Sequence, residues 1–206
     1  MKRVPVVATM LVGLAVVAMI ALGVWQLQRR GEKEALLAIV AANQTRPPIA
    51  FPNIAQGDDL LFRRARALCL QPVSWHVLGG RNASGASGYR QIERCRSGAE
   101  GAGFAVQIGI GHTADTAPAW KGGEVEGYIS HAPSTEPMIV AVFSHTPKTL
   151  MLVADPPLAG LDANPPADLS AIPNNHLAYA VQWFAFALIA AVIYVLALRK
   201  RLKSTG

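Results

Sequence analysis

The sequence contains none of the short motifs that mark nucleotide-binding loops or common hydrolase active sites. The glycine-rich stretch 79–85 lacks the Gly-Lys-Ser/Thr ending of a phosphate-binding loop. No Gly-x-Ser-x-Gly element marks a nucleophilic serine on a sharp turn. Four of the five histidines are scattered without the spacing of metal ligands: His76, His112, His131 and His145. These absences favour a protein that is not an enzyme.

Cysteine is scarce, with only Cys69 and Cys95 in the whole chain. There is no Cys-x-x-Cys pair, which excludes the usual dithiol redox motif and covalent haem attachment. Both cysteines lie between two apolar runs, and an oxidising compartment would allow them to form a structural disulfide. Free thiols and a redox or metal-relay pair are the remaining alternatives.

Charged residues are absent from two long runs, Val4–Leu27 and Leu177–Leu198. Each run is long enough to cross a hydrocarbon core of ~30 Å. We therefore expect transmembrane helices at 4–27 and 176–198 that form a hairpin. A cleaved signal peptide is the alternative for the first run, but this run exceeds the usual ~7–15 apolar residues of such peptides.

The net charge of +6 is confined to the two tails. Residues 28–175 hold 13 of the 19 Lys/Arg and all 13 Asp/Glu, so the six remaining cations flank the apolar runs. Positive charge near a span tends to stay in the cytoplasm. Both termini, including the basic tail 199–206, are therefore predicted to be cytoplasmic, with a periplasmic region at 28–172. A bacterial inner (plasma) membrane is favoured. A nucleic-acid partner is not expected, because the basic residues do not cluster on the central region.

The central region is expected to contain one helical extension of the first span, at 31–43, followed by strands. Alternating apolar residues predict half-buried strands at 104–110 and 124–129, and short apolar runs predict two more at 138–143 and 149–153. The five prolines of 155–173 indicate a rigid linker. The predicted fold class is membrane α+β: two transmembrane helices with a small antiparallel β-rich extracytoplasmic domain between them.

One histidine, His176, stands directly before the second apolar run. Ionisable side chains at such positions tend to face a protein interior, a cavity or a bound group. On a helix, His176 and Trp183 share a face with the small Ala180 between them. In a hairpin, Trp25 and Gln26 would approach them and form an apolar groove suited to a flat, metal-bearing ligand. The alternative is that the aromatic and histidine side chains are an ordinary interfacial belt.

Two segments resemble signatures of the surfeit locus protein 1 family, which assembles cytochrome c oxidase. They are Gly23-Val24-Trp25-Gln26-Leu27-Gln28-Arg29 and Pro173-Asn174-Asn175-His176-Leu177-Ala178-Tyr179-Ala180 with Gln182-Trp183-Phe184. The order of the two segments and their places at the span ends also agree with the family. The strand Val106-Gln107-Ile108-Gly109-Ile110-Gly111 departs from the family's Val-Asn-Arg-Gly-Trp-like element, which indicates a short, divergent member.

The resemblance implies a non-enzymatic assembly factor of the respiratory chain, a chaperone that binds haem a between its helices. The implied partners are the catalytic subunit of the oxidase, haem a synthase and the lipid bilayer. His176 would be the haem iron ligand, and the implied haem-binding residues beside it are Trp183, Tyr179, Trp25 and Gln26.

Two other classes of function are compatible with the sequence. One is an accessory subunit that stays bound to a respiratory complex. The other is a membrane-tethered sensor with an extracytoplasmic ligand-binding domain. The chain ends about eight residues after the second apolar run, with no kinase, methyl-accepting or DNA-binding region in that tail, which disfavours the sensor.

Overall fold

A computed structural model describes residues 5–52, 57–98, 103–133 and 148–203. The chain forms two compact units, one made of residues 1–35 with 172–206 and the other of residues 36–171. The predicted strand at 138–143 and the candidate His145 lie outside the described residues.

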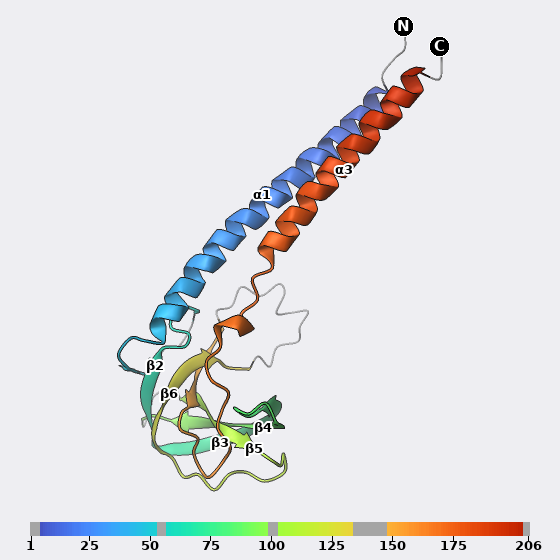
Figure 1. The fold of residues 1–206 in the computed structure, drawn as a ribbon. Helices are drawn as coiled ribbons and strands as arrows, with labels where there is room; N and C mark the ends of the chain where they lie inside the picture. The colour runs from blue at the N-terminus through green and yellow to red at the C-terminus, as the bar shows by residue number, and fades with distance from the viewer. Residues whose placement is uncertain (1–4, 53–56, 99–102, 134–147, 204–206) are drawn as a thin grey trace. The chain divides into compact units, whose positions relative to one another are not determined.

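The first unit is a pair of long helices, α1 (Val6–Asn43) and α3 (His176–Lys203), that run side by side (Figure 1). Each is long and apolar enough to cross a membrane. Only 6% of the most apolar window of each helix is buried within the protein. Apolar surface of this extent needs a non-aqueous surrounding, so the exposure agrees with the predicted spans. The last eight residues of α1 belong to the second unit.

Three contacts between α1 and α3 show that the two helices are antiparallel. The hydroxyls of Thr9 and Tyr194 are hydrogen-bonded at one end, and Gln26 and His176 are hydrogen-bonded at the other. Between them, Gly23 faces the ring of Phe184, and a Cβ at position 23 would lie 2.6 Å from a ring carbon. Glycine therefore allows the close approach of the two helices at this point.

The second unit is built on a seven-stranded sheet with the order β1-β2-β6-β7-β5-β4-β3. Two neighbouring pairs, β1/β2 and β5/β7, are parallel, and the other four are antiparallel. The strands are β1 (Ile49–Ala50), β2 (Arg64–Cys69), β3 (Gln71–Arg81), β4 (Ser87–Arg96), β5 (Phe104–Gly111), β6 (Gly123–His131) and β7 (Leu150–Ala154); a short 3₁₀ helix, η1 (Leu169–Ala171), follows them.

The predicted fold class, two long apolar helices with a β-rich domain between them, is confirmed, but the sheet is mixed and not antiparallel throughout. The strand β7 inserts between β5 and β6 and runs parallel to β5. Alternation of apolar side chains has a period of two in either direction of pairing, so it indicates a strand but not its neighbour. A single residue, Leu70, joins β2 to β3 although these strands lie near opposite edges, which requires the sheet to curl.

The core of the second unit lies around β5, β6 and β7. Its fully buried side chains include Val106, Ile108, Val125, Ile129 and Leu152. The half-buried pattern predicted for β5 is wrong. Gln107 is only 3% exposed, and Gly109 is buried as well.

The proline-rich segment after β7 covers the face of β5 that carries Gln107 and Gly109. The backbone N–H of Leu158 donates to Ile108 at 2.8 Å, and Asp162 exchanges two 3.0 Å backbone bonds with Ile110. Asn164 accepts a 2.7 Å bond from the side chain of Gln107. The segment predicted as a linker is thus, over residues 158–164, part of the sheet unit.

Cys69 and Cys95 form a disulfide, and both residues are buried. They lie at the ends of β2 and β4, beside the corner where Leu70 donates its N–H to the carbonyl of Arg96 at 2.9 Å. The bridge spans 26 residues of sequence. In the chain-entropy model, a loop of this length contributes about 3.5 kcal/mol of stability. This position supports a structural role for the pair.

Glu93 of β4 is a buried carboxyl, with 4% of the residue exposed. It pairs in register with Trp75 of β3 and Val106 of β5, and it has no ion-pair partner among the described residues. Burial raises the pKa of this carboxyl to about 7, because the charged form loses its hydration.

Candidate functional site

The candidate site lies where α3 begins, within the helix pair. Pro173, Asn174 and Asn175 precede the helix, and the carbonyl of Asn175 accepts the N–H of Tyr179 at 3.3 Å. Asparagine is a favoured residue immediately before a helix, so the sequence itself sets the start of α3 at His176. His176 and Tyr179, three residues apart, therefore project from one side of the first turn.

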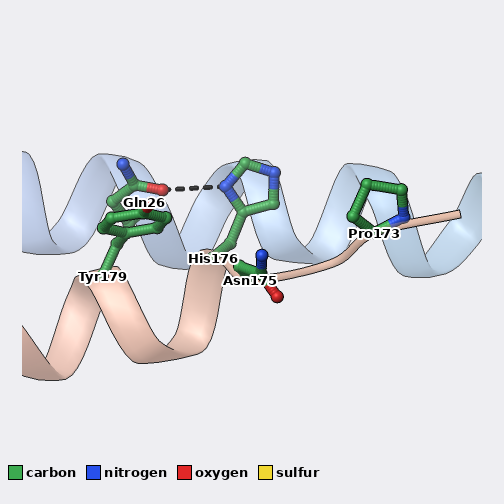
Figure 2. Close-up of a pocket in the computed structure, with 5 residues that line it drawn as sticks. All are labelled: Gln26, Pro173, Asn175, His176 and Tyr179. Carbon is green, nitrogen blue, oxygen red and sulfur yellow. Dashed lines mark hydrogen bonds between the residues drawn. The ribbon is translucent and has the colours of Figure 1, made fainter.

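His176 contacts α1 through one ring nitrogen. Its Nδ1 lies 2.8 Å from Oε1 of Gln26. Figure 2 marks this hydrogen bond with a dashed line. The other ring nitrogen, Nε2, has no hydrogen-bond partner among the described residues and points away from Gln26 (Figure 2). The site therefore presents one imidazole nitrogen that is committed and one that is available.

A shallow pocket of about 250 Å³ adjoins this histidine. Its lining residues, drawn in Figure 2, are Gln26, Pro173, Asn175, His176 and Tyr179. The volume is just below the ~300–1,000 Å³ of typical small-molecule sites, so the pocket does not enclose a haem. The donor chemistry does fit: an imidazole with an available nitrogen is a common axial ligand of haem iron. The residues present could therefore supply an iron ligand, but they do not enclose such a group.

The structure brings together three of the five residues predicted to bind the cofactor, His176, Gln26 and Tyr179. Trp25 and Trp183 do not line the pocket. Trp25 is 49% exposed, because neighbours on a helix point about 100° apart and Gln26 faces α3. Trp183 packs edge-on against Phe186, with the ring centroids 6.3 Å apart.

Ala180, the small residue between His176 and Trp183, does not leave open space on their shared face. Ala180 is only 1% exposed, so the face that His176 shares with Trp183 is closed by helix packing at this position. The groove of one imidazole flanked by two indoles does not form in this structure. The pocket is instead lined by two amide side chains, a phenol and a proline ring around the imidazole.

Sequence reasoning missed Pro173 and Asn175 as lining residues. Their neighbour Asn174 was missed too; among the described residues, its buried Oδ1 has no hydrogen-bond partner. All three stand directly before His176 in the second signature segment, so their proximity in sequence was the available signal.

The histidines of the sheet unit that the structure describes form no comparable site. The side chain of His112 is 82% exposed and lies 3.8 Å from a carboxylate oxygen of Asp162. His131 Nε2 is 2.7 Å from Oδ1 of Asp58. Across the part of the chain that the structure describes, no group of three or more His, Cys, Asp or Glu side chains could hold a metal ion.

The sequence model of the SURF1 family matches residues 13–188, a range that includes both signature segments, the sheet and the pocket. No curated protein matches the sequence.

Proposed function

The chain belongs to the SURF1 family, and on this premise we propose that it binds haem a and supports its insertion into the catalytic subunit of a haem–copper cytochrome c oxidase. The family is associated with cytochrome oxidase assembly and is not a known enzyme family. The family match and the two membrane-capable helices support a location in a membrane.

The observation that carries the haem a proposal is the available Nε2 of His176 at the pocket. When bound, haem a would supply the iron that this nitrogen ligates. His176 would hold the iron, and Gln26 would hold His176. Tyr179, which is 51% exposed, would offer a ring face and a hydroxyl at the rim of the pocket. Haem a synthase is the proposed donor of the cargo, and the oxidase catalytic subunit is its proposed acceptor.

The proposed orientation places both termini in the cytoplasm and the sheet unit in the periplasm of a bacterial plasma membrane. It rests on the basic residues after the second span, three of which lie in the last turn of α3: Lys200, Arg201 and Lys203. A reporter that is active only outside the cytoplasm should be active when fused at residue 60 and inactive when fused at the C-terminus. An active C-terminal fusion would contradict this orientation.

The direct test of the function is an absorption spectrum of the full chain, purified in detergent from a host that makes haem a. We expect bound haem a with a spectrum typical of histidine ligation. The same host without haem a synthase supplies the matched control. If the full chain carries no more haem a than an unrelated two-span protein purified in parallel, the haem a proposal is wrong.

A further inference from the structure

The side chain of Gln26 places its amide oxygen, which can only accept a hydrogen bond, next to the ring of His176. The contact joins Oε1 of Gln26 to Nδ1 of His176 at 2.8 Å. A side-chain amide oxygen has no proton to donate, so in this contact Nδ1 must carry the hydrogen. A neutral imidazole has only one such hydrogen, so Nε2 is left as a lone pair.

From this geometry we propose that Gln26 is a positioning residue that fixes the tautomer and the ring orientation of His176. The inference rests on the proposed function, because it gives the freed Nε2 a ligand to bind. Histidines that ligate metals usually donate their other ring N–H to a carboxylate, a carbonyl or water, and this bond orients the ring. The amide oxygen of Gln26 is placed to fill that role from the opposite helix.

The surrounding packing makes the contact specific to this register of the helices. Gly23 lies one turn before Gln26 on α1, and its missing side chain accommodates Phe184 of α3. A one-residue change of register in α1 would turn Gln26 by about 100° away from α3, and the same change in α3 would turn His176 away from α1. The helix pair therefore selects position 26, and the neighbouring Trp25 and Leu27 point elsewhere, being 49% and 42% exposed.

A different role for Gln26 would be to bind the cargo directly. The structure disfavours it, because the amide oxygen is already committed to His176. The proposal also differs from one in which the Gln26–His176 bond only holds the two helices together. If the bond only held the helices together, any side chain that packed as well as Gln26 would leave the His176 tautomer unchanged. If Gln26 positions the ring, the tautomer depends on a hydrogen-bond acceptor at position 26.

The experiment uses three variants of the full chain. Gln26→Leu removes the acceptor, Gln26→Glu retains one, and Gln28→Leu is the matched control, because Gln28 is exposed two residues along the same helix. The first readout is nitrogen NMR of histidine-labelled protein without haem, with the His176 signals assigned from a His176→Ala sample. We expect the Nδ1–H tautomer in wild type, Gln26→Glu and Gln28→Leu, and a mixture of tautomers in Gln26→Leu.

The second readout is the affinity for added haem a. Loss of an outer partner of a metal ligand typically costs ~10–100-fold in affinity, and we expect a loss of that size for Gln26→Leu. Gln26→Glu should restore most of it, and Gln28→Leu should match wild type. An unchanged tautomer and affinity in Gln26→Leu would overturn the inference. So would a failure of Gln26→Glu to restore the tautomer.

The two readouts separate this inference from the proposed function. If even wild type binds no haem a, the proposed function fails. A tautomer that changes in Gln26→Leu and is restored in Gln26→Glu would still support Gln26 as the residue that positions His176.

Discussion

Replacing His176 with alanine is expected to reduce bound haem a by more than the ~10–100-fold that is typical of losing an outer partner of a ligand. The imidazole is the one side chain in the pocket with a nitrogen that can ligate iron and that no other described group occupies. Alanine supplies no ligand. Active oxidase in cells should fall with the bound haem a.

Membrane insertion should not change in this variant, because the apolar run Leu177–Leu198 remains intact. The measurement is the ratio of haem a to protein in the purified full chain, together with the absorption spectrum. His112→Ala is the matched control, because the side chain of His112 is 82% exposed in the sheet unit. Trp25→Ala and Gln26→Ala should weaken binding less, since neither residue supplies the proposed ligand.

One result would contradict the ligand role of His176. If His176→Ala copurifies with as much haem a as wild type and an unaltered spectrum, His176 does not ligate the iron. His176 would then be an interfacial residue at the membrane edge, hydrogen-bonded to Gln26 for structural reasons alone.

Replacing Glu93 with glutamine is expected to stabilise the protein at alkaline pH and to leave its stability unchanged in acid. Burial raises the pKa of this carboxyl from 4.5 to about 7 in the folded chain. Between these values the folded state binds more protons than the unfolded state, so the free energy of unfolding falls as the pH rises from 4.5 to 7. Above pH 7 Glu93 is ionised in the folded chain, and the destabilisation reaches its full size. The pKa shift from 4.5 to about 7 corresponds to about 3 kcal/mol.

Glutamine has the shape of the protonated carboxyl and never ionises, so Glu93→Gln removes the penalty. We expect the variant to be more stable than wild type by up to ~3 kcal/mol at pH 8, and equal to it at pH 4. The measurement is denaturant unfolding of the detergent-purified chain at both pH values, followed through the β-sheet signal.

Glu124→Gln is the control for this comparison. Glu124 is an exposed carboxylate in β6, so its substitution removes the same charge without removing a buried one. If both substitutions changed the free energy of unfolding equally at pH 8, ionised Glu93 would not destabilise the folded chain through lost hydration.

The sequence was most reliable where one physical requirement fixes the structure. Crossing a membrane demands a long uncharged run, and α1 and α3 cover the two runs that meet this demand. The helix α1 also includes residues 31–43 without a break. In the sheet unit, alternation located β5 and β6, because the period of two belongs to each strand by itself.

Pairing and burial in the sheet depended on segments that are distant in the sequence. No local pattern states that β7 inserts between β5 and β6, or that residues 158–164 cover Gln107 and Gly109. The parallel β5/β7 pair and the loss of exposure on β5 follow from these long-range contacts. The prolines of 155–173 indicated a stiff segment but not its docking surface.

The candidate site shows the same division. The sequence alone located an imidazole at the mouth of a span and connected His176, Gln26 and Tyr179 through two signature segments. Only the packing of α1 on α3 decided that Gln26 meets the ring while Trp25 and Trp183 do not line the pocket. The reason is rotational: each residue turns a helix by about 100°, so the register of two helices, rather than proximity in sequence, determines which side chains meet.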